Sequence, residues 1–276
     1  MRINQAAQLQ LLSSNYKVNN RLQKIFERLS TGKRINRASD DAAMLSIAKQ
    51  LEKQVRGFRV VENNISDGMS AIAIGDGAAG SMSEMVQRQR ELAIQASNGT
   101  LNQDQRDALN TEFQQITAEI DRTARASNFN GMSLLDGQSP MSDGTGNIQV
   151  DPNSDVSSQV AMPPADLTAS ALGLDTLDIS NPANAAAAIS GLDAAASQIN
   201  SVRTSQGATY NRLESSYNNS VTNRINTTSA LSLAEDMDFA AGVSERARDS
   251  ILQQSNISVM RNFNDIAKNN LLSLLR

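Results

Sequence analysis

Hydrophobic residues recur in alternating steps of four and three near both ends of the chain. The N-terminal series is Leu11, Asn15, Val18, Leu22, Ile25 and Leu29. The C-terminal series is Leu252, Asn256, Val259, Phe263 and Ile266. This spacing puts each series on one side of a helix and is typical of a coiled coil, in which a buried Asn sets the register. Each end is therefore predicted to be a helix, and the two seams are natural partners.

The same spacing predicts further helices between the two ends. After Gly32 and a basic turn it resumes at Met44, which predicts one helix over 41–98, about 87 Å long at 1.5 Å per residue. Gly99 ends that helix, and a shorter one follows with Phe113 on its apolar side. A second helical arm begins at about residue 183.

Residues 140–182 differ from the rest of the chain. They hold all five prolines and six acids, but no Lys or Arg. Proline breaks helices, so this stretch is predicted to be an exposed insertion between two helical arms. Its segments 147–150 and 158–162 favour a small β hairpin or an irregular loop. The fold class that follows is mainly α: an elongated antiparallel coiled-coil bundle formed by both termini, with a small β-hairpin insertion.

The composition excludes several classes of enzyme. The chain has 276 residues and a formal charge of −4, with no Cys, His or Trp and only nine aromatic residues. Disulfides, zinc knuckles, thiolate nucleophiles and Ser-His-Asp triads are excluded. The charge balance gives no reason to expect nucleic acid or an anionic membrane as a partner. Residues 1–12 lack a secretory signal, which predicts a cytoplasmic chain unless another route exports it.

Two motifs suggest chemistry but lack its requirements. Residues 75–80 read GDGAAG, but a dinucleotide site needs a strand before this motif and an acid about 20 residues after it. Position 95 is Gln, and the glycines lie within a helical pattern, so a locally loosened helix is the better interpretation. Residues 151–155 open like a calcium loop, but Val156 and Met162 stand where Gly and Glu are needed. No metal and no cofactor is expected.

The ends carry more apolar residues than one helix pair can cover. Apolar side chains outside the seams include Ile3, Leu9, Leu12, Ile251, Ile257, Met260, Leu271, Leu272, Leu274 and Leu275. Because they lie on several sides, further copies of the chain are implied. The alternative is a compact bundle that folds back on itself. Residues 1–39 also hold eight bases and one acid, which fits either an electrostatic docking strip or a solvated helix face.

Several segments resemble bacterial flagellin. They are Glu27–Ala43 (ERLSTGKRINRASDDAA), Arg90–Thr100 (RELAIQASNGT), Ile116–Arg122 (ITAEIDR), Phe129–Leu135 (FNGMSLL) and Asn269–Arg276 (NNLLSLLR). With the arms between them, the resemblance covers about residues 1–139 and 183–276. Met44 departs from the family, which usually has Gly there, and so does the opening Met1-Arg2-Ile3.

The resemblance implies a structural subunit that self-assembles into the helical flagellar filament and has no catalytic activity. Residues 1–40 and 235–276 would form inner-core terminal helices. Residues 41–139 and 183–234 would form a helical rod, and 140–182 the Pro-rich acidic insertion. One alternative is the hook–filament junction protein, which shares the terminal architecture. The other is a nucleotide-binding module built on GDGAAG.

The resemblance also implies partners and a location. The expected partners are other flagellin copies, an export chaperone, the filament cap and hook-junction proteins, and the flagellar secretion apparatus would deliver the chain outside the cell. The expected polymerisation seam is Leu11, Val18, Leu22, Ile25, Leu29, Leu252, Val259, Phe263, Ile266, Leu271, Leu272 and Leu275. Toll-like receptor 5 of animal hosts would contact the positions that match its family site, which are Arg88, Leu92, Gln95 and Glu112.

Overall fold

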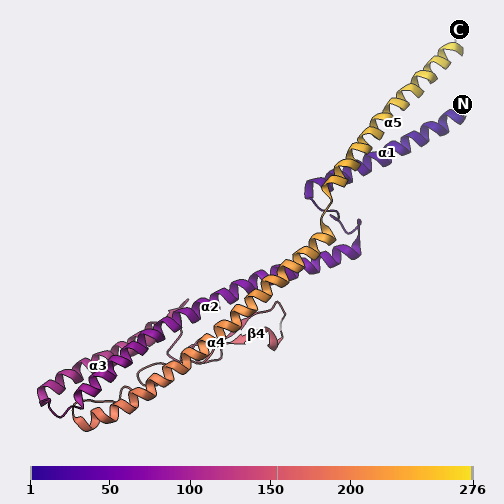
Figure 1. Ribbon diagram of the computed structural model, residues 1–276. Helices are drawn as coiled ribbons and strands as arrows, with labels where there is room; N and C mark the ends of the chain where they lie inside the picture. The colour runs from indigo at the N-terminus through magenta and orange to yellow at the C-terminus, as the bar shows by residue number, and fades with distance from the viewer. Residues whose placement is uncertain (1, 154, 275–276) are drawn as a thin grey trace. The chain divides into compact units, whose positions relative to one another are not determined.

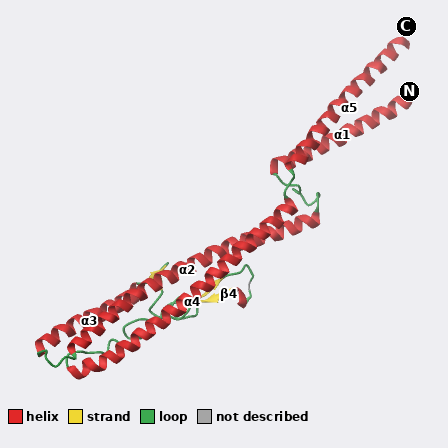
Figure 2. Ribbon diagram, in the orientation of Figure 1, coloured by secondary structure: helices red, strands yellow, loops and turns green. Residues whose placement is uncertain are grey.

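The computed structural model describes residues 2–153 and 155–274, and most of them are helical (Figure 1 and Figure 2). The helices are α1 (Arg2–Thr31), α2 (Ala42–Ala96), α3 (Gln103–Ala126), α4 (Pro182–Glu235) and α5 (Phe239–Leu274). The strands are β1 (Asn128–Phe129), β2 (Met132–Ser133), β3 (Asn147–Gln149) and β4 (Gln159–Ala161), with a 3-10 turn η1 (Val156–Ser158) before β4. The expected fold class, mainly α with a small β insertion, is confirmed.

Side chains in the sequence account for where the helices begin and end. Residue Gly32 follows α1 with a left-handed φ of +71°, a conformation that glycine adopts without strain. Helices α2 to α5 begin after an Asp or Asn whose side-chain oxygen accepts a hydrogen bond from a backbone N–H of the first turn. These capping residues are Asp41, Asn102, Asn181 and Asp238. The second helical arm is therefore divided at Asp238, a break that the hydrophobic pattern alone did not predict.

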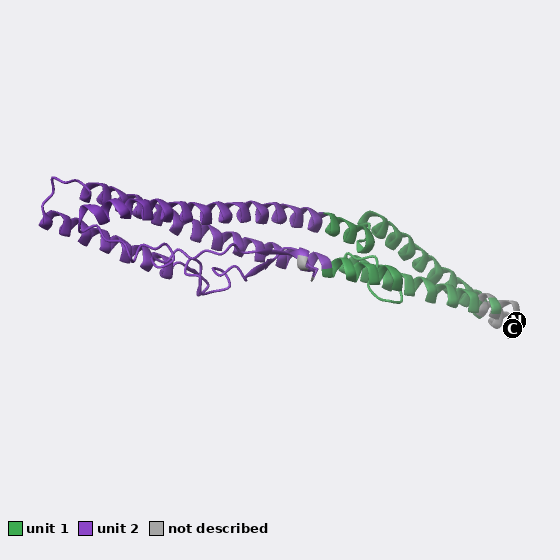
Figure 3. Cartoon of the chain, turned by 90° about the horizontal axis from the view of Figure 1, so that it is seen from below, with its two compact units in different colours: residues 1–53, 226–276 green, residues 54–225 purple. Residues whose placement is uncertain are grey.

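The chain forms two compact units, drawn in different colours in Figure 3. Residues 1–53 and 226–276 make the first, which we call the terminal unit, and residues 54–225 make the second, which we call the rod unit. Both boundaries fall inside long helices, α2 and α4. In the terminal unit α1 packs antiparallel against α5.

A short pairing of backbone segments joins the bases of α1 and α5. Lys33 and Asp236 form an antiparallel bridge. The N–H of Arg34 donates to the carbonyl of Glu235 at 2.7 Å, and the N–H of Met237 donates to the carbonyl of Gly32 at 2.9 Å. The Lys33 ammonium adds an ion pair of 2.8 Å with the largely buried Glu235 carboxylate. These contacts fix where the two helices start relative to one another.

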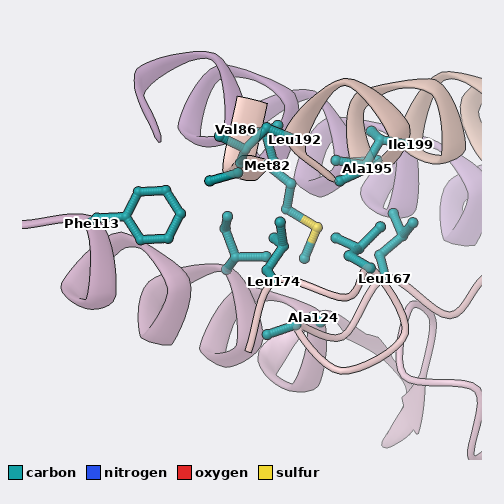
Figure 4. Close-up of a cluster of buried hydrophobic side chains, with 14 of the residues drawn as sticks. Met82, Val86, Phe113, Ala124, Leu167, Leu174, Leu192, Ala195 and Ile199 are labelled. Carbon is teal, nitrogen blue, oxygen red and sulfur yellow. The ribbon is translucent and has the colours of Figure 1, made fainter. Parts of the chain in front are cut away.

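The rod unit is closed by a continuous apolar core (Figure 4). Met82 of α2, Phe113 of α3 and Ile199 of α4 are fully buried there. Leu167 and Leu174 come from the segment after β4 and fill the same core. Three helices and this segment together surround the apolar side chains, so none of the stripes inside the core faces solvent.

The prediction that residues 140–182 are an exposed insertion was wrong. Leu167, Leu174 and Ile179 of this stretch are fully buried, and Ile148 and Val160 belong to a second apolar cluster. Proline forbids helix but does not forbid burial, and the apolar residues of the stretch pack as loop and strand. The predicted hairpin is confirmed: β3 and β4 are antiparallel, with Ile148 opposite Val160.

A second hairpin, β1–β2, was not predicted. Its strands pair antiparallel, with Phe129 opposite Met132. The turn between them has Asn130 at φ +51° and Gly131 at φ +78°. Two consecutive left-handed residues are the geometry of a type I′ turn, and Asn-Gly is its preferred sequence. The dipeptide was therefore a usable signal for this hairpin.

Candidate assembly surface

The N-terminal seam lies where its spacing predicts. Val18, Leu22 and Ile25 are buried against α5, and Leu11 and Leu29 are half-buried. The seam's polar member, Asn15, is half-buried, and its side-chain oxygen has no hydrogen-bond partner. α1 therefore presents an almost wholly apolar line to α5.

The line of α5 that packs against α1 is mostly polar. Gly242, Asp249, Asn256 and Phe263 lie seven residues apart, and all four are buried or half-buried. The Asp249 carboxylate is fully buried and receives the Arg21 guanidinium at 3.1 Å. Next to this pair, Gln253 donates to the side chain of Asn19 at 2.7 Å. The heptad spacing of these four residues was visible in the sequence, but only Phe263 is a large apolar residue, so the line was not recognised.

The apolar residues of the C-terminal seam lie on a different side of α5. They were expected to be buried against α1, but Leu252, Val259 and Ile266 are 40%, 41% and 56% exposed. The structure therefore does not bring these three residues together with Val18 and Ile25. The side chains of Leu271 and Leu272, and the whole of Leu275, lie outside the described residues.

Further large apolar side chains are exposed around both terminal helices. On α1 they are Leu9, Leu12, Tyr16 and Phe26, and on α5 they include Phe239, Val243, Ile251 and Ile257. One of them has a local partner, since the Arg246 guanidinium lies 4.9 Å from the centre of the Phe26 ring. Exposed apolar surface on this scale marks an interaction site.

The basic residues of the N-terminal strip are largely engaged within the terminal unit. Arg21 and Lys33 pair with acids of the C-terminal arm. Arg37 pairs with Glu27 at 2.9 Å, and Lys24 lies 3.8 Å from Asp40. Hydrogen bonds from the backbone N–H of Asn36, above all, lower the pKa of Asp40, with help from Arg37 and Lys24. Part of this strip therefore fastens the unit itself.

The four positions matched to the receptor site occupy the rod unit. The Arg88 guanidinium donates to Glu112 at 2.8 Å and to Glu91 at 3.1 Å, and the bond to Glu112 in particular raises the pKa of Arg88 above its ordinary value. Gln95 is exposed on the same helix. Leu92 is buried in the rod core. Arg88, Gln95 and Glu112 are thus accessible in a single subunit, and Leu92 is not.

The GDGAAG segment lies inside α2 and is helical throughout. No strand precedes it in the described part of α2, so the strand–turn–helix arrangement of a dinucleotide site is missing. Gly75 instead packs against Gln206, where a Cβ would lie 3.1 Å from the amide nitrogen. Its glycine therefore serves helix packing.

Two further searches cover the described residues alone. Among them, no group of three or more His, Cys, Asp or Glu side chains is placed to hold a metal ion. Over the same residues, every helix is too short or too polar to cross a bilayer.

Comparison with known proteins identifies the family. The model of the bacterial flagellin N-terminal helical region matches residues 3–139, and that of the C-terminal helical region matches 189–275. A flagellin of Halalkalibacterium halodurans is 36% identical over 245 residues, 89% of each chain. The flagellar filament 30.7 kDa core protein of Treponema maltophilum is 32% identical over 91% of each chain.

A solved structure agrees with these sequence relatives. The crystal structure of Bacillus cereus flagellin is 36% identical and superimposes with a TM-score of 0.50, covering 57% of this chain and 88% of that one. The sequence relatives are flagellins and filament core proteins, which favours a filament subunit over the hook–filament junction protein. The family is structural and non-enzymatic, which removes the nucleotide-binding alternative. With both terminal regions matched and relatives this similar along most of its length, the chain belongs to the bacterial flagellin family.

Proposed function

We propose that copies of this filament subunit assemble through the apolar sides of α1 and α5 that face away from each other. The observation that carries the proposal is the exposure of Leu252, Val259 and Ile266 while α5 is already paired with α1. A two-helix pair covers one side of each helix and leaves the other sides in water. A neighbouring copy offers the same sides and can bury them.

We propose that the two arms serve different layers of the filament. Residues 1–40 and 235–276 would pack together as the inner layer, and residues 41–139 with 183–234 as the outer rod. The rod unit supports this division, because its apolar core is complete within one copy. The 140–182 segment would belong to the outer layer, since it packs on the rod core.

Growth of filament seeds tests the assembly surface. The variant Leu252→Gln/Val259→Gln replaces two apolar side chains on α5 with polar ones of similar size. Purified subunits of this variant should extend short seeds at least tenfold more slowly than the parent. A matched control is Gln254→Ala/Ser255→Gln, which changes exposed polar positions on the same helix. Equal growth of variant and parent would contradict the assigned surface.

We infer that the chain leaves the cell through the flagellum's own secretion channel and works outside the cell. Its family membership supports this, as it supports an export chaperone, a cap and hook-junction proteins as partners. In a strain that lacks the filament cap, the chain should accumulate in the medium as free subunit. If it stayed inside such cells at parental expression levels, this export route would be wrong.

We propose that a host receptor of the Toll-like receptor 5 class reads the rod face around Arg88, Gln95 and Glu112, while the buried Leu92 supports that face from below. The Arg88–Glu112 ion pair supplies a charged feature at its centre. Arg88→Ala should weaken receptor signalling by free subunits. Arg90→Ala is the control, because Arg90 lies on the same helix and forms a comparable ion pair with Asp193 at 2.7 Å. Unchanged signalling by Arg88→Ala would remove this site.

A further inference from the structure

The Arg21–Asp249 pair is the most deeply buried charge contact between the terminal helices. The Asp249 side chain is 0% exposed, whereas the Arg21 side chain is 50% exposed. One carboxylate oxygen accepts from the Arg21 Nε, and the other has no hydrogen-bond partner. Arg248 Nε lies 3.9 Å from that second oxygen, too far for a hydrogen bond. Arg21 is therefore the group that compensates the buried charge.

The position of Asp249 conflicts with what the apolar line of α1 would favour. At about 100° per residue, Leu252, Val259 and Ile266 lie about 60 to 100° around α5 from Asp249. If α5 turned by that angle, two leucine-sized side chains would cover Val18 and Ile25, and the carboxylate would return to water. Burying apolar surface is favourable, and burying a carboxylate is unfavourable unless it is paired. The observed orientation therefore needs a cause.

We propose that the Arg21–Asp249 pair is a rotational lock that keeps the apolar side of α5 turned outward for the next copy. This inference rests on the proposed assembly surface and deepens it. The backbone contacts at Lys33 and Asp236 set the start of the helix pair, but they lie more than three turns of α5 before Val259 and leave its rotation free there. Arg21 holds Asp249 against α1 and thereby selects the side of α5 that a neighbour meets.

The lock predicts unequal effects of removing its two members. Arg21→Ala leaves a buried carboxylate without a partner, so α5 turns, hides Leu252 and Val259, and loses the assembly surface. Asp249→Leu leaves only a half-exposed guanidinium, which water can solvate, and it keeps the same side of α5 packed on α1. An ion pair that merely added stability would make the two single variants equally defective.

Seeded growth of purified full-length subunits tests the lock. Arg21→Ala should extend seeds at least tenfold more slowly than the parent, while Asp249→Leu and Arg21→Lys should stay within twofold. The double variant Arg21→Ala/Asp249→Leu should recover to within threefold of the parent, because no carboxylate then remains to be expelled. This recovery also excludes a folding defect caused by the loss of the arginine side chain. Lys17→Ala removes an exposed charge from the same helix and should match the parent.

Several results would overturn the lock. They are equally slow growth of Arg21→Ala and Asp249→Leu, a double variant as slow as Arg21→Ala, or a Lys17→Ala variant as slow as Arg21→Ala. Parental growth by Arg21→Ala would also overturn it while leaving the assembly surface intact. If the Leu252→Gln/Val259→Gln subunits extended seeds like the parent, the proposed surface itself would fail, so the two failures are distinguishable.

Discussion

The rod unit and the terminal unit are built from the same kind of helix, but they treat apolar residues differently. In the rod unit, three helices and the 140–182 segment surround Phe113, Leu174 and Ile199 and bury them completely. In the terminal unit, two helices share one line of contact, and Ile251 on α5 remains 66% exposed. The number of covering elements, more than the hydrophobic pattern, decides whether a stripe becomes a core or a surface for partners. One chain thus carries a finished domain and an unfinished one.

The largest expected effect separates a core residue from an interface residue. Phe113→Ala removes a fully buried ring from the rod core and should lower the free energy of unfolding of the rod by about 3–5 kcal/mol. Ile251→Ala, on the exposed side of α5, should change it by less than about 0.5 kcal/mol in a single subunit but should slow seeded growth. Urea unfolding followed by circular dichroism measures the first quantity. A similar loss of stability from both variants would remove the contrast between the units.

The second prediction concerns the segment that closes the rod. A Cβ at Gly146 would lie 2.4 Å from the backbone carbonyl oxygen of Pro140, so Gly146→Ala must displace backbone that anchors the segment. We expect a loss of about 1–3 kcal/mol in the free energy of unfolding. Gly77→Ala is the matched control, because no atom lies within 4 Å of its added Cβ. Since alanine favours helix, this control should gain about 0.5–1 kcal/mol. Identical signs for the two variants would show that the segment does not close the core.

The smallest effect concerns a carboxylate in the same segment. The Ser180 hydroxyl, above all, and the Ser180 and Ile179 backbone and Asn184 side chain lower the pKa of Asp178 through hydrogen bonds. A lowered pKa means that the ionised form stabilises the fold above about pH 4, the unfolded value for Asp, and that this contribution disappears as the pH falls through the folded value. Asp178→Asn should therefore cost about 1 kcal/mol at pH 7. The gap to the parent should close only below about pH 4; a gap that closed between pH 6 and 8 would assign it to another group.

Sequence patterns predicted the helices well because each helix has a strong local signal. The four-three spacing and residues such as Gly32 located α1, α2 and α3, and α1 buried the seam side chains Val18 and Ile25 as its spacing predicts. The side of α5 that packs on α1 was missed, because it depends on how a buried Asp249 finds Arg21 across 228 residues. No local pattern encodes such a pairing. The burial of 140–182 was missed for a related reason, since its core contacts come from distant helices.

Hydrogen–deuterium exchange of the full chain, measured on dilute subunits and on assembled filaments, tests the contrast between the units most directly. Peptides within 61–213 should be protected in both samples, because the rod core is complete in one copy. Peptides within 8–31 and 239–266 should exchange rapidly in dilute subunits and become protected in filaments, where neighbours cover the exposed apolar sides. Strong protection of both terminal helices in the dilute subunit would contradict the account.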